Sequence, residues 1–194
     1  MKQLAPAASA LALILAACSP EAPAPADAPA AEAPGAPVPT GIREALFEAD
    51  GVTLADPAGG AGRKLAFGDA EAEVIAYVTG LNGGQPLRRG SNDECGAGPL
   101  TFAYLGNYFE LAFSDGSLAG WGASETPPQG FATASGVHVG STLAELRAAH
   151  PDVTVSEDTL GPEFAAGEIF GFLSGATDTA TVTSMWAGVN CVFR

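Results

Sequence analysis

The chain has 194 residues, 47% of them hydrophobic, and a formal net charge of −14 at pH 7. So negative a chain repels nucleic acid and anionic membrane surfaces, which argues against both as partners and favours a basic partner or simply high solubility. Charged residues make up only 15% of the chain, so we expect a fold that depends on the packing of Ala, Gly and β-branched side chains.

Residues 1–17 have the layout of a signal peptide, with Lys2 before a short apolar run that ends in small residues. The run is shorter than the roughly 20 residues that a transmembrane helix needs. Leu15-Ala16-Ala17-Cys18 resembles the lipobox of bacterial lipoproteins at every position. The resemblance implies cleavage before Cys18 and lipidation of that residue with diacylglycerol and an acyl chain such as palmitate. An ordinary signal peptide with a cysteine nearby is the alternative.

The lipobox also predicts a compartment. Two or three acyl chains hold a protein essentially permanently at a membrane, because each buried methylene contributes about 0.8 kcal/mol. Ser19 follows the cysteine where an Asp is typical of inner-membrane retention, so we expect the outer membrane, with the protein facing the periplasm or the cell surface. The inner membrane is the alternative. Residues 18–40, almost all Ala and Pro after the cysteine, are expected to form a disordered tether because frequent Pro forbids a helix interior.

Lipidation of Cys18 leaves Cys95 and Cys191 as an even pair in an oxidising compartment. We therefore predict a disulfide between them. The alternative is that Cys95, within Glu94-Cys95-Gly96, is a catalytic nucleophile, which requires a free thiol and a nearby base.

Residues 41–194 are expected to form a single α+β domain. In chain order, the pattern first predicts a hairpin over 45–54 and an extended segment over 63–67. A helix capped by Asp69 and ended by Gly80 follows, and then a Gly-rich loop over 82–100. Strands are predicted at 109–113 and 118–121, on either side of the Asp115-Gly116 turn. A second series follows: a strand over 137–139, a helix with the capping box Thr142-Leu143-Ala144-Glu145 that Pro151 stops, and strands at 152–155, 168–173 and 180–187.

Each series passes from a glycine (Gly68 or Gly140) to a helix and then to strands that end in tryptophan (Trp121 or Trp186). We therefore predict two degenerate units, about 65–121 and 137–194, each a helix followed by an antiparallel meander. Chance recurrence of Gly-capped helices is the alternative. The layout over 65–194 resembles the tandem repeat of the beta-lactamase inhibitor protein and the single unit of the outer-membrane-assembly lipoproteins. That resemblance implies a non-catalytic module that grips another protein with its sheet face and loops.

Glu94-Cys95-Gly96-Ala97-Gly98-Pro99 and Trp186-Ala187-Gly188, together with Cys191 and Arg194, also resemble a group of short bacterial lipoproteins, some bearing an aspartate-semialdehyde dehydrogenase name. The residues argue against that activity, because no G-x-G-x-x-G motif follows a strand to form the nucleotide-binding turn of a dehydrogenase.

Other chemistry is sparse. His138 and His150 have no second histidine at metal-ligand spacing, and nucleophile and phosphate-loop motifs are absent, so we expect no metal, no cofactor and no enzyme. Arg88, Arg89 and Trp121 are the candidate partner contacts, with the loops 82–99 and 122–130 beside them. An envelope enzyme using Cys95 or a carboxylate, and a purely structural coat protein, are the alternatives.

Overall fold

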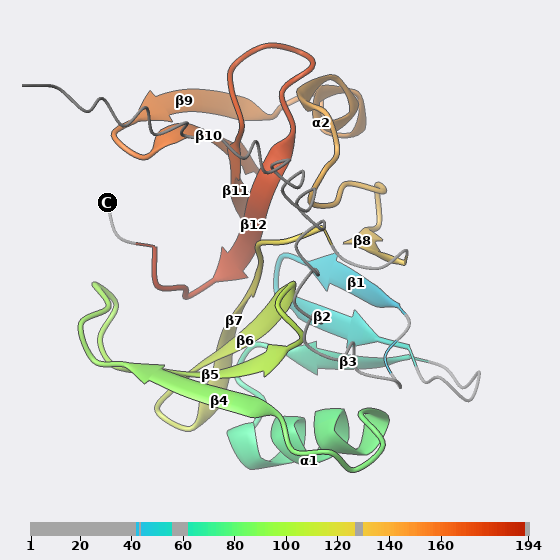
Figure 1. Cartoon of the computed structure of the whole chain (residues 1–194), viewed down its shortest axis with the longest axis vertical. Helices are drawn as coiled ribbons and strands as arrows, with labels where there is room; N and C mark the ends of the chain where they lie inside the picture. Colours follow the sequence, from blue (N-terminus) through green and yellow to red (C-terminus); the bar gives the residue numbers. More distant parts are fainter. Residues whose placement is uncertain (1–41, 43, 56–61, 127–129, 193–194) are drawn as a thin grey trace, which may run out of the picture. The chain divides into compact units, whose positions relative to one another are not determined.

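The computed structural model describes residues 42, 44–55, 62–126 and 130–192. The predicted signal peptide, lipidated Cys18 and tether lie outside the described residues. In the described part the chain forms twelve strands in two sheets and two helices (Figure 1). The fold is therefore mostly β, with less helix than the predicted α+β class suggests.

The smaller sheet has the strand order β3-β2-β1-β8. Its strands are β1 (Ala45–Glu48), β2 (Gly51–Leu54), β3 (Arg63–Ala66) and β8 (Phe131–Thr133). The predicted hairpin is confirmed, since β1 and β2 pair antiparallel from Ala45↔Leu54 to Glu48↔Gly51. In contrast, β1 pairs in parallel with β8, which comes from much later in the chain.

The larger sheet has the order β4-β5-β6-β7-β12-β11-β10-β9. Its strands are β4 (Arg88–Asn92), β5 (Leu100–Leu105), β6 (Phe109–Ser114), β7 (Ser117–Ala123), β9 (Thr154–Asp158), β10 (Gly161–Ala166), β11 (Ile169–Leu173) and β12 (Val182–Gly188). Two antiparallel meanders, β4–β7 and β9–β12, meet where β7 pairs antiparallel with β12. The last strand of the chain thus occupies the middle of the sheet.

A helix precedes each meander: α1 (Glu71–Leu81) before β4 and α2 (Leu143–Ala149) before β9. The capping box predicted at α2 is confirmed, with the Thr142 side chain accepting from the Glu145 N–H. The cap predicted at α1 is wrong. Ala70 holds the N-cap position without a side-chain hydrogen bond, and Asp69 instead accepts from the backbone N–H of Ala66 at 3.0 Å. α1 also runs through Gly80, because one glycine weakens a helix without ending it.

Four strands were not predicted. β4 lies inside the predicted loop 82–100, β5 begins where that loop was expected to end, and β8 and β10 lack the apolar alternation that marks a strand. Conversely, the strand predicted over 137–139 does not form. Val137 and Val139 are buried, but the segment pairs with no described strand and passes into a turn at Val139 and Gly140, where φ is 102°.

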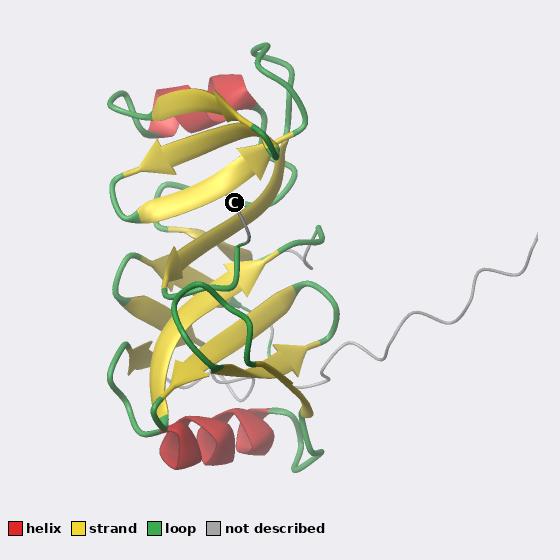
Figure 2. Cartoon of the chain, turned by 90° about the vertical axis from the view of Figure 1, so that its left-hand side faces the viewer, coloured by secondary structure: helices red, strands yellow, loops and turns green. Residues whose placement is uncertain are grey.

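Side chains alternate between the two faces of the larger sheet. Phe109, Leu111 and Phe113 of β6 point into the main core, which also holds buried residues of α1, α2 and the smaller sheet. The opposite side of the sheet, here called the outer face, carries a second cluster around Phe102 and Ala112. Figure 2 shows this sheet from the side on which the loop 93–99 and the C-terminal residues lie.

Candidate binding face

A single row of side chains crosses the outer face at the junction of the two meanders. Strand register aligns Glu110 of β6 with Gly122 of β7, and Gly122 with Trp186 of β12. The row continues outward on both sides. Its members, here called the outer row, are Arg88, Tyr104, Glu110, Gly122, Trp186 and Phe170.

Aromatic rings dominate the second half of this face. The Trp186 ring lies 6.4 Å from that of Phe170 and 5.1 Å from that of Phe172, centroid to centroid. Trp186 is nearly buried, at 7% exposure, whereas both phenylalanines are partly exposed. Partly exposed rings that are held by a sheet are typical of surfaces where other molecules bind.

A cleft opens beside these rings, with a volume of about 150 Å³. Glu110, Phe172, Trp186 and the segment after β12 form its sides. Gly122 also lines the cleft, and a side chain at this position would press on two neighbouring side chains. A Cβ at this position would lie 3.0 Å from the Oε1 atom of Glu110 and 2.9 Å from the Nδ2 atom of Asn190.

Glu110 gives the cleft its charge. Its side chain is half-buried, and burial raises the pKa of the carboxyl above its ordinary range, although the Arg88 guanidinium opposes that rise. Among the described residues, the Glu110 carboxylate has no hydrogen bond and no ion pair. Burying a carboxylate without a partner costs stability, and such groups are concentrated at functional sites.

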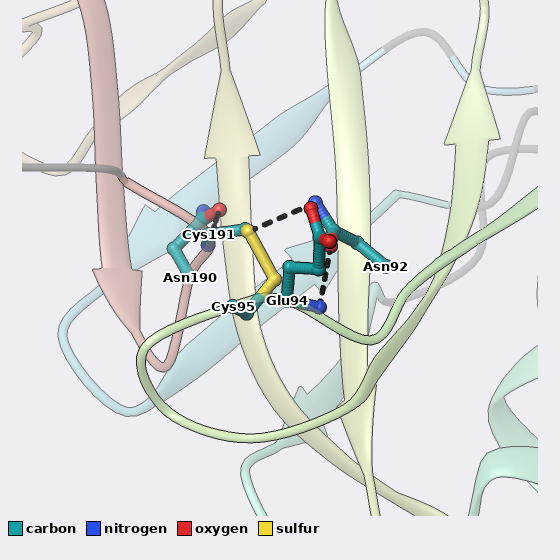
Figure 3. The surroundings of a disulfide bond; sticks show 5 residues. All are labelled: Asn92, Glu94, Cys95, Asn190 and Cys191. Carbon is teal, nitrogen blue, oxygen red and sulfur yellow. Dashed lines mark hydrogen bonds between the residues drawn. A yellow bond between two sulfur atoms is a disulfide. The ribbon is translucent and has the colours of Figure 1, made fainter.

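The predicted disulfide is confirmed and forms one boundary of this site. Cys95, in the loop after β4, is bonded to Cys191, after β12 (Figure 3). Asn92 donates to the Cys191 Sγ at 3.4 Å and accepts from the Glu94 N–H at 2.9 Å. Because Cys95 is in a disulfide, it offers no thiol, and the alternative that made it a nucleophile is not supported.

Asn190, next to Cys191, holds the C-terminal end of the disulfide in place. Its side-chain amide donates to the Trp121 carbonyl at 3.2 Å, and its Oδ1 atom accepts from the Cys191 N–H at 2.8 Å. The segment that lines the cleft is therefore held both by the disulfide and by the hydrogen bond of Asn190 to β7.

The two candidate arginines do not act together. Because successive side chains of a strand point to opposite faces, β4 separates them. Arg88 lies on the outer face, 3.6 Å from the centroid of the Tyr104 ring. Arg89 lies on the other face, where it pairs with Glu71 of α1. Of the two candidate partner contacts, only Arg88 belongs to the outer row.

Trp121 is also corrected. It is fully buried, stacks on Phe47 at 4.6 Å, and donates its indole N–H to the Glu48 carbonyl at 2.8 Å. Its role is to join the two sheets, so it is not a surface contact.

Both histidines make local hydrogen bonds. His138 lies 2.9 Å from the Ser141 hydroxyl, and His150 lies 2.8 Å from the Ser135 hydroxyl. Within the described ranges no three metal-ligating side chains gather, and neither helix is long and apolar enough to cross a membrane. Family models, curated proteins and solved structures give no match to this chain.

Sequence reasoning missed Glu110, Phe170 and Phe172 as site residues. The alternation around Phe109 and Leu111 places Glu110 on the opposite side of β6, and the same alternation in β11 places Phe170 and Phe172 on one side. These signals locate a face. They do not show that the faces of β6 and β11 meet across β7 and β12.

Proposed function

We propose that the chain is a lipid-anchored protein of the cell envelope whose domain binds another protein through the outer face, without catalysing a reaction. The observation that carries the proposal is the cluster of Phe170, Phe172 and Trp186 beside the cleft, on a sheet that a disulfide ties down. Aromatic side chains with restricted freedom contribute strongly to protein–protein binding.

The anchor rests on the Leu15-Ala16-Ala17-Cys18 pattern. Metabolic labelling with an alkyne analogue of palmitate tests it directly. We expect the wild-type chain to incorporate the label and to fractionate with the outer membrane, and the Cys18→Ser variant to do neither. Labelling of the variant would contradict the proposal.

Site-specific photo-crosslinking in living cells tests the binding face. A photoreactive residue in place of Phe170 is expected to give a discrete adduct with one envelope protein. The same residue in place of Glu73, which is exposed on α1, is the matched control and is expected to give none. Equal adducts from both positions, or none from either, would count against the outer face as the binding surface.

The two meanders, each preceded by a helix, are proposed to be degenerate copies of one unit, as the resemblance to the tandem repeat of the beta-lactamase inhibitor protein suggests. Their shared order of a helix followed by four antiparallel strands supports this proposal.

A carboxylate-based enzyme is the second candidate, and the raised pKa of Glu110 in a cleft favours it. Intact mass analysis of the molecule captured at Phe170 separates the two. A binding module leaves its partner unaltered in mass, whereas a hydrolase or transferase changes it.

A further inference from the structure

The cleft on the outer face is small and chemically mixed. Its volume of about 150 Å³ lies well below the ~300–1,000 Å³ of pockets for drug-sized ligands. That space fits the head group of one side chain. Its lining joins a carboxylate, Glu110, to two aromatic side chains, Phe172 and Trp186.

This lining has a definite chemical complement. Aromatic faces attract cations within about 6 Å of the ring centroid, and a carboxylate pairs with ammonium or guanidinium groups. The same face already holds one such contact, since the Arg88 guanidinium lies 3.6 Å from the Tyr104 ring centroid.

No cation of the described chain neutralises Glu110. Arg88, the charged group that faces it, is separated from it by Tyr104 in the outer row and forms no ion pair with it. The ion pairs among the described residues involve Lys64, Arg89 and Arg147, and none of these cations pairs with Glu110. The net charge of −14 adds long-range attraction for a basic partner.

From these observations we infer that the cleft receives a basic side chain, lysine or arginine, of the protein partner. The inference rests on the proposed binding function and specifies its chemistry. Glu110 pairs with the cationic head group, and Phe172 and Trp186 pack against it. Gly122 has no side chain to press on the Glu110 carboxylate.

NMR titration of the full chain in detergent tests the inference. The probes are three capped tripeptides, acetyl-Gly-X-Gly-amide, in which X is arginine, lysine or citrulline, the uncharged analogue of arginine. The readouts are the Trp186 indole N–H signal, assigned with the Trp186→Phe variant, and the pH midpoint of the Glu110 side-chain carboxyl.

We expect the arginine and lysine peptides to shift the Trp186 signal saturably and to lower the Glu110 midpoint, and citrulline to do neither. Glu110→Gln should weaken binding at least tenfold, and Phe172→Leu several-fold. Glu157→Gln, which removes a negative charge on exposed β9, should leave binding unchanged. Equal binding of citrulline and arginine, or undiminished binding by Glu110→Gln, would overturn the inference.

Arg194 lies outside the described residues and follows closely after Val192, which lines the cleft. The Arg194→Gln variant decides whether the chain supplies its own cation. We expect the Glu110 midpoint to be unchanged in this variant without peptide. A rise would show that the C-terminal arginine pairs with Glu110, which overturns the inference of a partner's side chain.

The photo-crosslinking experiment at Phe170 keeps the two proposals distinct. An adduct at Phe170 together with no preference for cationic peptides would reject the basic side chain and retain the binding function. Preference for cationic peptides without any adduct would support the cation site and reject the protein-binding function.

Discussion

The two halves of the larger sheet share a topology but differ in what covers their outer face. In the first half, β4–β7, the disulfide-bonded loop lies over the sheet, and Cys95 packs with buried Leu100, Phe102 and Ala112. In the second half, β9–β12, Phe170 and Phe172 are partly exposed. The same arrangement of strands thus carries a covered apolar cluster around Phe102 in one half and two partly exposed phenylalanine rings in the other. The disulfide-bonded loop, and not the strand order, makes this difference.

The helices that precede the two halves also differ, in how their N-termini are capped. α2 begins with a complete capping box, whereas α1 has no side-chain cap at Ala70. In α1 the neighbouring Asp69 is engaged by the turn that follows β3, since it accepts from the Ala66 N–H. The two helices therefore differ in their local N-terminal hydrogen bonds, while the disulfide links the loop after β4 to the segment after β12.

Removal of the disulfide should have the largest effect. In a Cys18→Ala background, the Cys95→Ser/Cys191→Ser double variant should lose up to about 4.7 kcal/mol of unfolding free energy, the chain-entropy estimate for a loop of about 100 residues. The two cysteines are 96 residues apart. Urea unfolding followed by circular dichroism measures the loss. A loss below about 1 kcal/mol would show that the covered half does not depend on its crosslink.

Truncation of one phenylalanine in each half tests the difference in burial. Phe102, at 5% exposure, should cost about 3–5 kcal/mol when replaced by alanine, because its cavity is closed by the loop. Phe170→Ala should cost roughly 1 kcal/mol, since the ring is already partly in water. The same urea unfolding compares them, and equal costs would break the distinction between the covered cluster and the partly exposed rings.

The helix caps give a smaller and reciprocal pair of effects. Thr142→Ala removes the capping box of α2 and should cost about 1 kcal/mol, whereas Ala70→Ser offers α1 a cap at an exposed position and should gain about 0.5–1 kcal/mol. Thermal unfolding of the two single variants provides the measurement. A loss in both would mean that the turn before α1 does not tolerate a capping side chain.

The smallest effect concerns the junction of the halves and depends on pH. The pKa of Glu110 is raised in the folded state, so the folded state holds this proton more tightly than the unfolded state. Stability should therefore fall as the pH rises from the ordinary glutamate range through the raised pKa. Glu110→Gln should lack this fall and be more stable than wild type at neutral pH, and equal to it in acid.

Unfolding free energies measured across that pH range test the expectation. Glu157→Gln is the matched removal of one exposed negative charge. If stability still fell over this pH range in Glu110→Gln, the fall would come from another titrating group and not from Glu110.

The parts of the fold that the sequence predicts are those with local signals. The Asp115-Gly116 turn forms with φ values of 50° and 75°, and the Thr142–Glu145 capping box forms as its spacing requires. β4 was missed because an edge strand of polar residues, Arg88 to Asn92, shows no apolar alternation. Polar residues such as arginine and asparagine are also common in loops, so the composition of β4 does not distinguish it from one.

The candidate site was predicted only in fragments. The sequence predicts the disulfide cysteines, but it marks Trp186 only as the end of a strand and Trp121 as a partner contact, because composition does not show which tryptophan packs between sheets. Glu110 and Phe172 become neighbours of one cleft only through the pairing of β7 with β12. That pairing joins segments about 65 residues apart, and no local pattern records its register.

The position of β12 has a consequence for how the chain matures. As the polypeptide emerges from its N-terminal end, β4 to β7 can pair in order, but the far edge of β7 stays unpaired until Val182–Gly188 arrive. An unpaired edge invites pairing with other chains. When β12 pairs with β7, it covers that edge and joins the two meanders. The same step brings Trp186 to the cleft and Cys191 close to Cys95. Chains that stop short of it would present two separate half-sheets and no assembled cleft.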